Sequence, residues 1–177
     1  LMEWVEGLSL MEATPLLPHA GEGQGGARGV KGTVVAAMGE AVAGVLSQTR
    51  HLDAGFAHRD ISPRNIMIRT SSRSIEEQVA SGSFDVCLVD LGSSSVTRAE
   101  DPTFTMRSHV WRAGTPEYAA PEMLTNDVAK AEGLRQSPSV DVYALCSVLY
   151  ELYAGRTPFD VASRPLRSPY QIKTEGR

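Results

Sequence analysis

The sequence predicts an α+β fold that is mostly helical, with a few short strands. Two long segments, at residues 33–52 and 140–153, carry apolar residues at the three- and four-residue steps of a helix. Two brief apolar runs, at residues 66–68 and 86–89, have the length of strands. Because 177 residues suffice for one hydrophobic core and are few for two, we expect these elements to share a single core.

Composition excludes several functional classes. The formal net charge of −4 offers no basic surface for nucleic acid. No apolar run approaches the roughly 20 residues that cross a membrane. Cys87 and Cys146 are too few for a disulfide scaffold and lack the spacing of a zinc site. We therefore expect a cytoplasmic protein with no nucleic-acid partner and no membrane segment in this chain.

The elements of the first third can be justified in chain order. Residues 1–5 are mostly apolar and are followed by Glu6 and Gly7, which predicts the end of a buried strand and a bend. Residues 11–32 hold two prolines and six glycines, a composition typical of loops. The first long helix is expected to follow this loop, over residues 33–52.

The remaining elements surround the two short strands, which we expect to pair with each other. The polar segment between them, residues 69–83, is expected to pass over the surface, and residues 92–113 predict an extended loop. The helix at 140–153 is apolar around nearly its whole circumference, which predicts burial on most sides, with Gly155 as its C-cap. Residues 161–177 predict a solvated tail.

Four motifs that carry chemistry follow one another along the chain. The first is His58-Arg59-Asp60-Ile61-Ser62-Pro63-Arg64-Asn65. It is followed by Val89-Asp90-Leu91-Gly92, by Gly114-Thr115-Pro116-Glu117-Tyr118-Ala119-Ala120-Pro121-Glu122, and by Asp141 on the second long helix. In this order they resemble the C-terminal half of the signature of eukaryotic-type (Hanks-type) protein kinases: HRDxxxxN, the DFG position, the APE segment and the aspartate of the next helix.

The resemblance implies the C-terminal lobe of a protein kinase, mostly helical with short β-hairpins at the catalytic cleft. It divides the chain into a hinge (1–10), the lobe (11–160, with catalytic loop 58–65 and activation segment 90–122) and an incomplete C-terminal part of the lobe (161–177). Nothing in the sequence matches the Gly-rich loop or the strand lysine and its glutamate partner. We therefore expect the N-terminal lobe to be absent, and this chain to be a fragment that is inactive alone.

The resemblance also implies an activity, which is transfer of the γ-phosphate of Mg²⁺-ATP to a hydroxyl of a protein substrate. Asp60 would orient the proton of the attacking hydroxyl, and Thr115 would bridge to Asp60 beside the acceptor. Asn65 and Asp90 offer the oxygen ligands that Mg²⁺ prefers. Taken singly, each of these residues is more simply a turn or capping residue. Their joint order favours the catalytic interpretation.

The start of the chain resembles the hinge that holds the adenine of ATP. By this alignment Met2 is the gatekeeper, and the backbone groups of Glu3 and Val5 would bond the adenine edge. Met67 would form the floor of the nucleotide pocket, next to the phosphate-side residues Asn65 and Asp90.

Further residues have structural roles in the family resembled. His58 would pack and hydrogen-bond without taking part in the chemistry, and Gly92 would let the chain turn sharply after Asp90. Glu122 would pair with an arginine farther along the chain. Asp141 would hold the catalytic-loop backbone through its N–H groups, because a carboxylate buried in a helix needs such partners.

Arg59 suggests a regulatory site. In the family resembled, an arginine before the catalytic aspartate binds a phosphate on the activation loop through a bidentate contact. We expect Thr103 or Thr105 to carry that phosphate, although a loop rich in serine and threonine can also be simply solvated.

The sequence departs from the kinase pattern at several points. Ser62 stands where serine/threonine kinases place a lysine, and tyrosine kinases also lack a lysine there. The expectation of serine/threonine specificity therefore depends on the segment at residues 114–118. Leu91 replaces the usual phenylalanine. The G-x-G-x-x-G at residues 21–26 follows the hinge instead of preceding it, so a flexible linker is favoured over a phosphate-binding loop.

Two other functions stay open at this point. The first is a pseudokinase or truncated kinase-like binding module without catalysis. The second is a small-molecule phosphotransferase of the antibiotic-kinase type, which shares the Asp…Asn…Asp arrangement but typically lacks the Ala-Pro-Glu segment.

Overall fold

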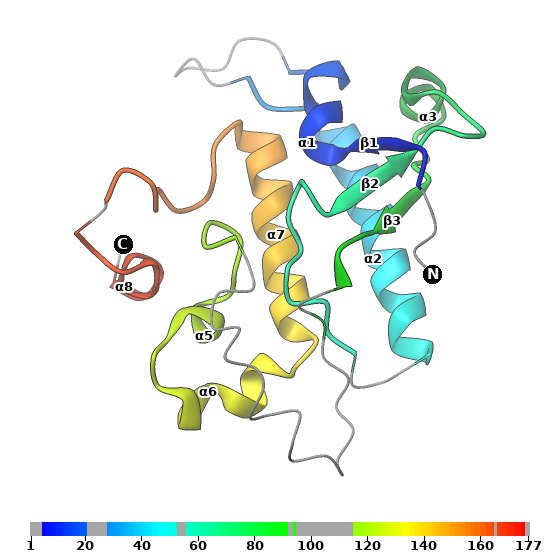
Figure 1. Ribbon diagram of the computed structural model, residues 1–177. Helices are drawn as coiled ribbons and strands as arrows, with labels where there is room; N and C mark the ends of the chain where they lie inside the picture. The colour runs from blue at the N-terminus through cyan, green and yellow to red at the C-terminus, as the bar shows by residue number, and fades with distance from the viewer. Residues whose placement is uncertain are drawn as a thin grey trace.

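A three-stranded antiparallel sheet stands at the centre of one side of the molecule (Figure 1). A computed structural model of the protein describes residues 5–20, 28–52, 56–91, 94, 115–164 and 166–175. The strands are β1 (Gly7–Ser9), β2 (Ile66–Arg69) and β3 (Val86–Leu88), with β2 in the middle. The pairing expected for the two short apolar runs is therefore confirmed, with Ile66 opposite Leu88.

The first strand lies later in the chain than the sequence pattern suggested. It begins at Gly7, where a bend was expected, and pairs Gly7 with Arg69. A β-carbon at Gly7 would lie 2.2 Å from the carbonyl oxygen of Ile68, so only glycine permits this close approach of the two strands. The strand end expected within residues 1–5 falls almost wholly outside the described residues.

Two long helices, α2 (Gly32–Leu52) and α7 (Ser139–Ala154), pack against each other, with α2 behind the sheet and α7 to one side of it (Figure 1). Both confirm the helices predicted from apolar periodicity. Their facing side chains form the centre of the core, in which Met38, Val42 and Val148 are fully buried. Gly155 ends α7 in the left-handed conformation, with φ of 67°, so the predicted C-cap is also confirmed.

The expectation that α7 is buried on most sides is wrong for one face of the helix. Val142 is 52% exposed and Tyr153 is 65% exposed, and Cys146 between them is exposed as well. Val142 and Cys146 are four residues apart and Tyr153 follows seven residues later, so the three positions share one exposed stripe of α7.

A short helix, α1 (Leu10–Ala13), continues into a 3₁₀ turn, η1 (Thr14–Leu16), where the sequence analysis expected only loop. Ser9 and Glu12 form a capping box: the Ser9 hydroxyl accepts from the Glu12 N–H, and the Ser9 N–H donates to the Glu12 carboxylate. Because the N–H of Met11 donates to the carbonyl of Pro63 at 2.9 Å, α1 is joined directly to the catalytic-loop motif.

The excursion between β2 and β3 contains another unexpected helix, α3 (Ile75–Ser81). It begins with a second capping box, Ser74 with Glu77, and ends at Gly82 in the left-handed conformation. Gln78, in the middle of this helix, is fully buried. Its amide group donates to the carbonyls of Arg69 and Arg73 at 2.8 and 3.1 Å and accepts from the Asp85 N–H at 2.7 Å.

Replacing Gln78 with leucine should therefore lower the free energy of unfolding by about 2–3 kcal/mol, because three backbone polar groups lose their buried partner. Urea denaturation measures this change. Ala80→Leu is the matched control, since it places the same side chain on the exposed face of α3. Equal stability of the two variants would show that the Gln78 bonds contribute nothing.

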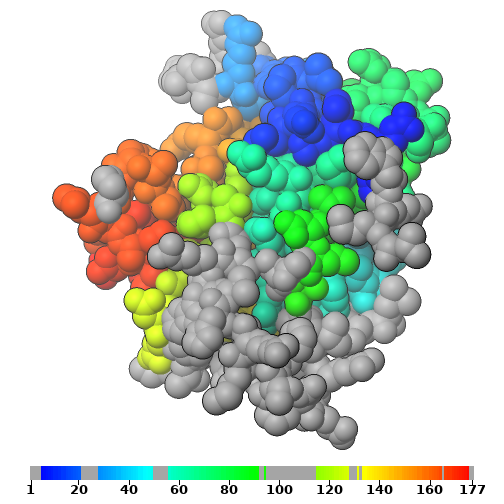
Figure 2. All heavy atoms as spheres, in the orientation of Figure 1, coloured from blue at the N-terminus to red at the C-terminus, as the bar shows by residue number. Residues whose placement is uncertain are grey.

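Three further helices build the other end of the molecule: α5 (Pro121–Leu124), α6 (Val128–Arg135) and α8 (Pro169–Glu175). The solvated tail expected over residues 161–177 is wrong at α8, where Ile172 and Lys173 are buried. In the space-filling view, α8 (red) lies against the yellow-green region that contains α5 (Figure 2). None of the helices within the described ranges combines the length and the apolar character needed to cross a membrane.

Candidate active site

The catalytic-loop motif leads into β2, and the Val89-Asp90 motif follows β3 directly. Because β2 and β3 are antiparallel, the start of one and the end of the other lie at the same edge of the sheet. The N–H of Val89 donates to the carbonyl of Asn65 at 3.0 Å, which extends the pairing into both motifs. Asn65 and Asp90, 25 positions apart in the sequence, are thus brought to one edge of the sheet.

Asp60, in the loop that leads to β2, is half-buried, with each carboxylate oxygen held by a different donor. Its Oδ2 accepts from the Asn65 side-chain amide at 3.0 Å, and its Oδ1 accepts from the Thr115 backbone N–H at 3.2 Å. The same Asn65 nitrogen donates to the Asp60 carbonyl at 2.8 Å. The Asp60 carboxylate is therefore oriented before any ligand binds, and the amide oxygen of Asn65 points away from Asp60.

His58, two residues before Asp60, is fully buried. Its Nε2 lies 3.1 Å from the carbonyl of Val89, and its Nδ1 lies 3.4 Å from the N–H of Asp60. A carbonyl can only accept and an N–H can only donate, so both contacts are satisfied together by the neutral ring with its proton on Nε2. In this form His58 joins the catalytic loop to the end of β3.

Asp141, at the start of α7, is 4% exposed and accepts two backbone hydrogen bonds from the catalytic loop. The His58 N–H reaches its Oδ2 and the Arg59 N–H reaches its Oδ1, each at 2.8 Å. Burial raises the pKa of Asp141, and these two N–H groups oppose that rise. The contacts hold Arg59 in a left-handed conformation, with φ of 69°, that a non-glycine residue adopts only at a cost.

The Arg59 side chain extends toward α6. Its Nε donates to the carbonyl of Arg135 at 3.1 Å, and the Arg135 Nε donates to the carbonyl of Glu122 at 2.7 Å. Burial lowers the pKa of Arg59, while the Asp141 charge opposes the effect. The catalytic loop, α6 and the Ala-Pro-Glu helix α5 are thus connected through backbone carbonyls. The phosphate-binding role of Arg59 stays a prediction, because Thr103 and Thr105 lie outside the described residues.

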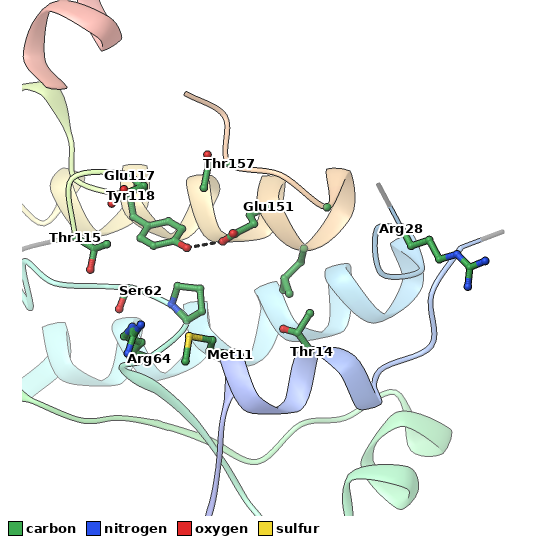
Figure 3. A pocket seen from close by; sticks show the side chains of 13 residues that line it. Met11, Thr14, Arg28, Ser62, Arg64, Thr115, Glu117, Tyr118, Glu151 and Thr157 are labelled. Atoms are coloured by element: carbon green, nitrogen blue, oxygen red, sulfur yellow. Dashed lines mark hydrogen bonds between the residues drawn. The ribbon is translucent and has the colours of Figure 1, made fainter. Parts of the chain in front are cut away.

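A pocket of about 520 Å³ opens between the catalytic loop, α1 and the end of α7 (Figure 3), and it is lined in part by Thr115, whose N–H donates to Asp60. Its walls include Ser62, Arg64, Thr115, Glu117, Tyr118 and Glu151. The Tyr118 hydroxyl donates to the Glu151 carboxylate at 2.6 Å. Burial and the Glu151 charge together raise the pKa of Tyr118, so the phenol keeps its proton across the physiological range.

Ser62, at the wall of this pocket, is 1% exposed. Its hydroxyl makes no hydrogen bond within the described part of the chain, which is rare for a buried polar atom. The position at which serine/threonine kinases have a lysine therefore carries an uncharged hydroxyl here. Within the same motif, the cation that lines the pocket is Arg64, two residues further on.

The donor set at the sheet edge fits Mg²⁺ held largely by phosphate and water. Asn65 and Asp90 are the residues there whose side-chain oxygens could hold the ion, and Asp90 adopts a left-handed conformation with φ of 60°. Over the described ranges there is no cluster of three or more histidine, cysteine, aspartate or glutamate residues that could bind a metal by itself. Mg²⁺ commonly needs only one or two protein ligands when it is bound with a nucleotide.

Several expected site residues cannot be placed. Met2, Glu3, Gly92, Thr103 and Thr105 lie outside the described residues. Of the expected adenine contacts, Val5 is half-buried ahead of β1, and Met67 sits in β2 opposite both Ser9 and Cys87. The roles given to all these residues stay predictions.

Sequence reasoning missed two residues that line the pocket, Tyr118 and Glu151, and one that binds its wall from outside, Lys173. Tyr118 was quoted only as part of a motif, and Glu151 and Lys173 lie 33 and 54–56 residues from their partners. No local pattern indicates such contacts, because they depend on how α7 and α8 pack.

Comparisons with known proteins agree with this geometry. Residues 28–173 match the family model described as "Protein kinase domain". The chain is 37% identical over 106 residues to the serine/threonine-protein kinase PkaB of Streptomyces coelicolor, an overlap that covers 60% of this chain and 22% of that protein. It is 36% identical over 109 residues to PkaA of the same organism (62% and 16%) and 30% identical over 113 residues to CHK1 of Saccharomyces cerevisiae (64% and 18%). The chain thus spans about a fifth of the length of these relatives.

Proposed function

Because the chain belongs to the protein kinase family, we propose that it catalyses transfer of the γ-phosphate of ATP to a serine or threonine hydroxyl of a protein. The observation that carries this proposal is the Asp60 carboxylate, which accepts hydrogen bonds from Asn65 and from Thr115, since Thr115 also lines a pocket that can admit an acceptor side chain. The names of the relatives support the choice of serine and threonine. The segment from Thr115 to Tyr118 agrees with it.

Phosphoryl transfer needs little covalent chemistry from the protein and depends on positioning and charge. Asp60 would accept a hydrogen bond from the acceptor hydroxyl and take its proton as the oxygen bonds to phosphorus. Asn65 and Asp90 would hold Mg²⁺, which, when bound, neutralises charge on the nucleotide phosphates. Asp141 and His58 would act indirectly, because they hold the backbone N–H groups of residues 58–60.

The direct test is phosphate transfer from radiolabelled ATP to a general protein acceptor by the full-length gene product. Labelled phosphoserine or phosphothreonine is the expected product. The rival function, a kinase-like binding module, is favoured by the absence of lysine at position 62. Nucleotide binding without labelled product would support that rival and contradict ours.

Asp90→Asn should weaken the binding of Mg²⁺-ATP about tenfold or more, since it removes the charged ligand for the metal. Calorimetric titration with ATP, in the presence and absence of Mg²⁺, measures the effect. The difference between the two conditions should shrink in the variant. Asp160→Asn, an exposed aspartate far along the chain, is the control. An unchanged Mg²⁺ dependence would remove Asp90 from the metal site.

A further inference from the structure

Lys173, on α8, is a buried cation that the proposed chemistry does not use. It is 9% exposed, and its ammonium donates to two carbonyls of a distant segment, Glu117 at 2.9 Å and Ala119 at 2.6 Å. We call residues 115–119 the acceptor turn, because Thr115, Glu117 and Tyr118 line the pocket and Thr115 donates to Asp60. A side chain from the last described helix therefore reaches the segment that borders the active site.

The surroundings of the ammonium show that its burial is costly. The rings of Tyr143 and Phe159 lie 5.3 and 5.6 Å from it, and these cation–π contacts replace only part of the lost hydration. Burial lowers the pKa of Lys173 to about 8, while the Glu117 charge opposes the shift. An apolar side chain, such as that of neighbouring Ile172, would pack α8 at lower cost. The contribution of the lysine must therefore come from the two bonds that only a donor can make.

Those bonds act on a turn that is already folded tightly. The N–H groups of Tyr118 and Ala119 both donate to the Thr115 carbonyl, at 2.9 and 3.1 Å. At the other end of the turn, the Thr115 N–H donates to Asp60. A continuous set of hydrogen bonds thus runs from Lys173 through the acceptor turn to the carboxylate. The nucleotide side, Asn65 and Asp90, meets this set only at Asp60, through the Asn65 amide, and is otherwise held by β2 and β3.

We propose that Lys173 is a positioning residue that fixes the acceptor turn against Asp60, and that it sets the affinity for the protein acceptor without affecting that for ATP. This inference rests on the proposed function. It assigns to α8 a part in acceptor binding, although α8 contributes no residue to the pocket.

Steady-state kinetics of the full-length gene product, with myelin basic protein as acceptor, tests the proposal. Lys173→Met should raise the KM for the acceptor about tenfold and leave the KM for ATP within about twofold, since one charge-assisted bond is worth roughly that factor. Lys173→Arg, which keeps a cationic donor, should restore most of the loss. If Lys173→Met does not fold, Lys173→Gln replaces it, because glutamine is too short to reach both carbonyls.

Ile172→Ala is the matched control, since it weakens the packing of α8 next to Lys173 but leaves the two carbonyl bonds. An equal rise in the acceptor KM in this variant would overturn the proposal, as would a parallel rise in the KM for ATP in Lys173→Met. A failure of the proposed function is recognised separately, because the wild-type protein would then transfer no phosphate.

Hydrogen exchange provides a readout that does not depend on activity. In Lys173→Met the Tyr118 and Ala119 amides should exchange faster than in the wild type, and in Lys173→Arg they should not. Unchanged exchange in Lys173→Met would show that the lysine does not hold the acceptor turn, and the proposal would fail whatever the kinetics.

Discussion

Replacing Asp60 with asparagine should lower kcat for phosphotransfer by about a thousandfold, with ATP affinity within about threefold of the wild type. The substitution keeps an oxygen that can accept from the Thr115 N–H, but an amide cannot take up the proton of the acceptor hydroxyl. A positioned base commonly contributes two to four orders of magnitude to a rate. Transfer from radiolabelled ATP measures kcat, and calorimetric titration measures the affinity.

Asp85→Asn is a suitable control for this substitution, because Asp85 is an aspartate outside the pocket that pairs with Arg69 on the surface. Its activity should match that of the wild type. Normal turnover by Asp60→Asn would remove Asp60 from the chemistry and contradict the proposed mechanism. A loss of ATP affinity as large as the loss of kcat would instead place Asp60 in nucleotide binding.

Replacing Asp141 with alanine should lower the free energy of unfolding by about 3 kcal/mol, with loss of activity as well. The carboxylate is the shared acceptor for the His58 and Arg59 N–H groups, and without it two buried donors lose their partner. The left-handed backbone of Arg59 also loses the contact that holds it. Urea denaturation gives the stability, and phosphotransfer below the unfolding transition gives the activity.

Asp141→Asn refines this prediction, because it keeps one acceptor oxygen and replaces the other with a donor. Its stability should lie between those of the wild type and Asp141→Ala. Asp160→Ala, at an exposed aspartate, should change stability by less than about 0.5 kcal/mol. If Asp141→Ala were as stable as this control, the two short hydrogen bonds would have no energetic role.

The sequence was sufficient to predict the long helices with a periodic apolar pattern and the strands formed by a short apolar run. Helix α2 and helix α7 were found because apolar residues recur along each of them, and β2 and β3 because each is a short apolar run beside a motif. The exposed stripe on α7 could not be predicted, since apolar residues such as Val142 and Tyr153 give no sign of which face meets the core.

The shorter helices were missed for a different reason. Helix α1 has 4 residues and α3 has 7, too few for periodicity to be detected. The signal that indicates the start of each is a capping box, a serine followed three residues later by a glutamate: Ser9 with Glu12 and Ser74 with Glu77. A search for capping boxes would have found them in segments whose composition resembles loop.

At the site, the motifs indicated contacts between their own residues, such as those of Asp141 with the catalytic loop, and gave no sign of contacts with residues outside them. Asp60 and Asn65 are five residues apart, so one motif predicts that they act together. The bonds of Tyr118 to Glu151 and of Lys173 to the acceptor turn join separate elements. Such contacts are set by tertiary packing, which no motif records.

The bonds between Asp141 and the catalytic loop also have a consequence for folding. Asp141 lies 83 and 82 residues after the two N–H groups that it binds. Contacts of such high sequence separation form only after a large loop has closed, and unaided backbone disfavours the conformation of Arg59. We therefore expect the backbone at His58 and Arg59 to reach its folded conformation only after α7 has packed against the loop, later than the helices themselves form.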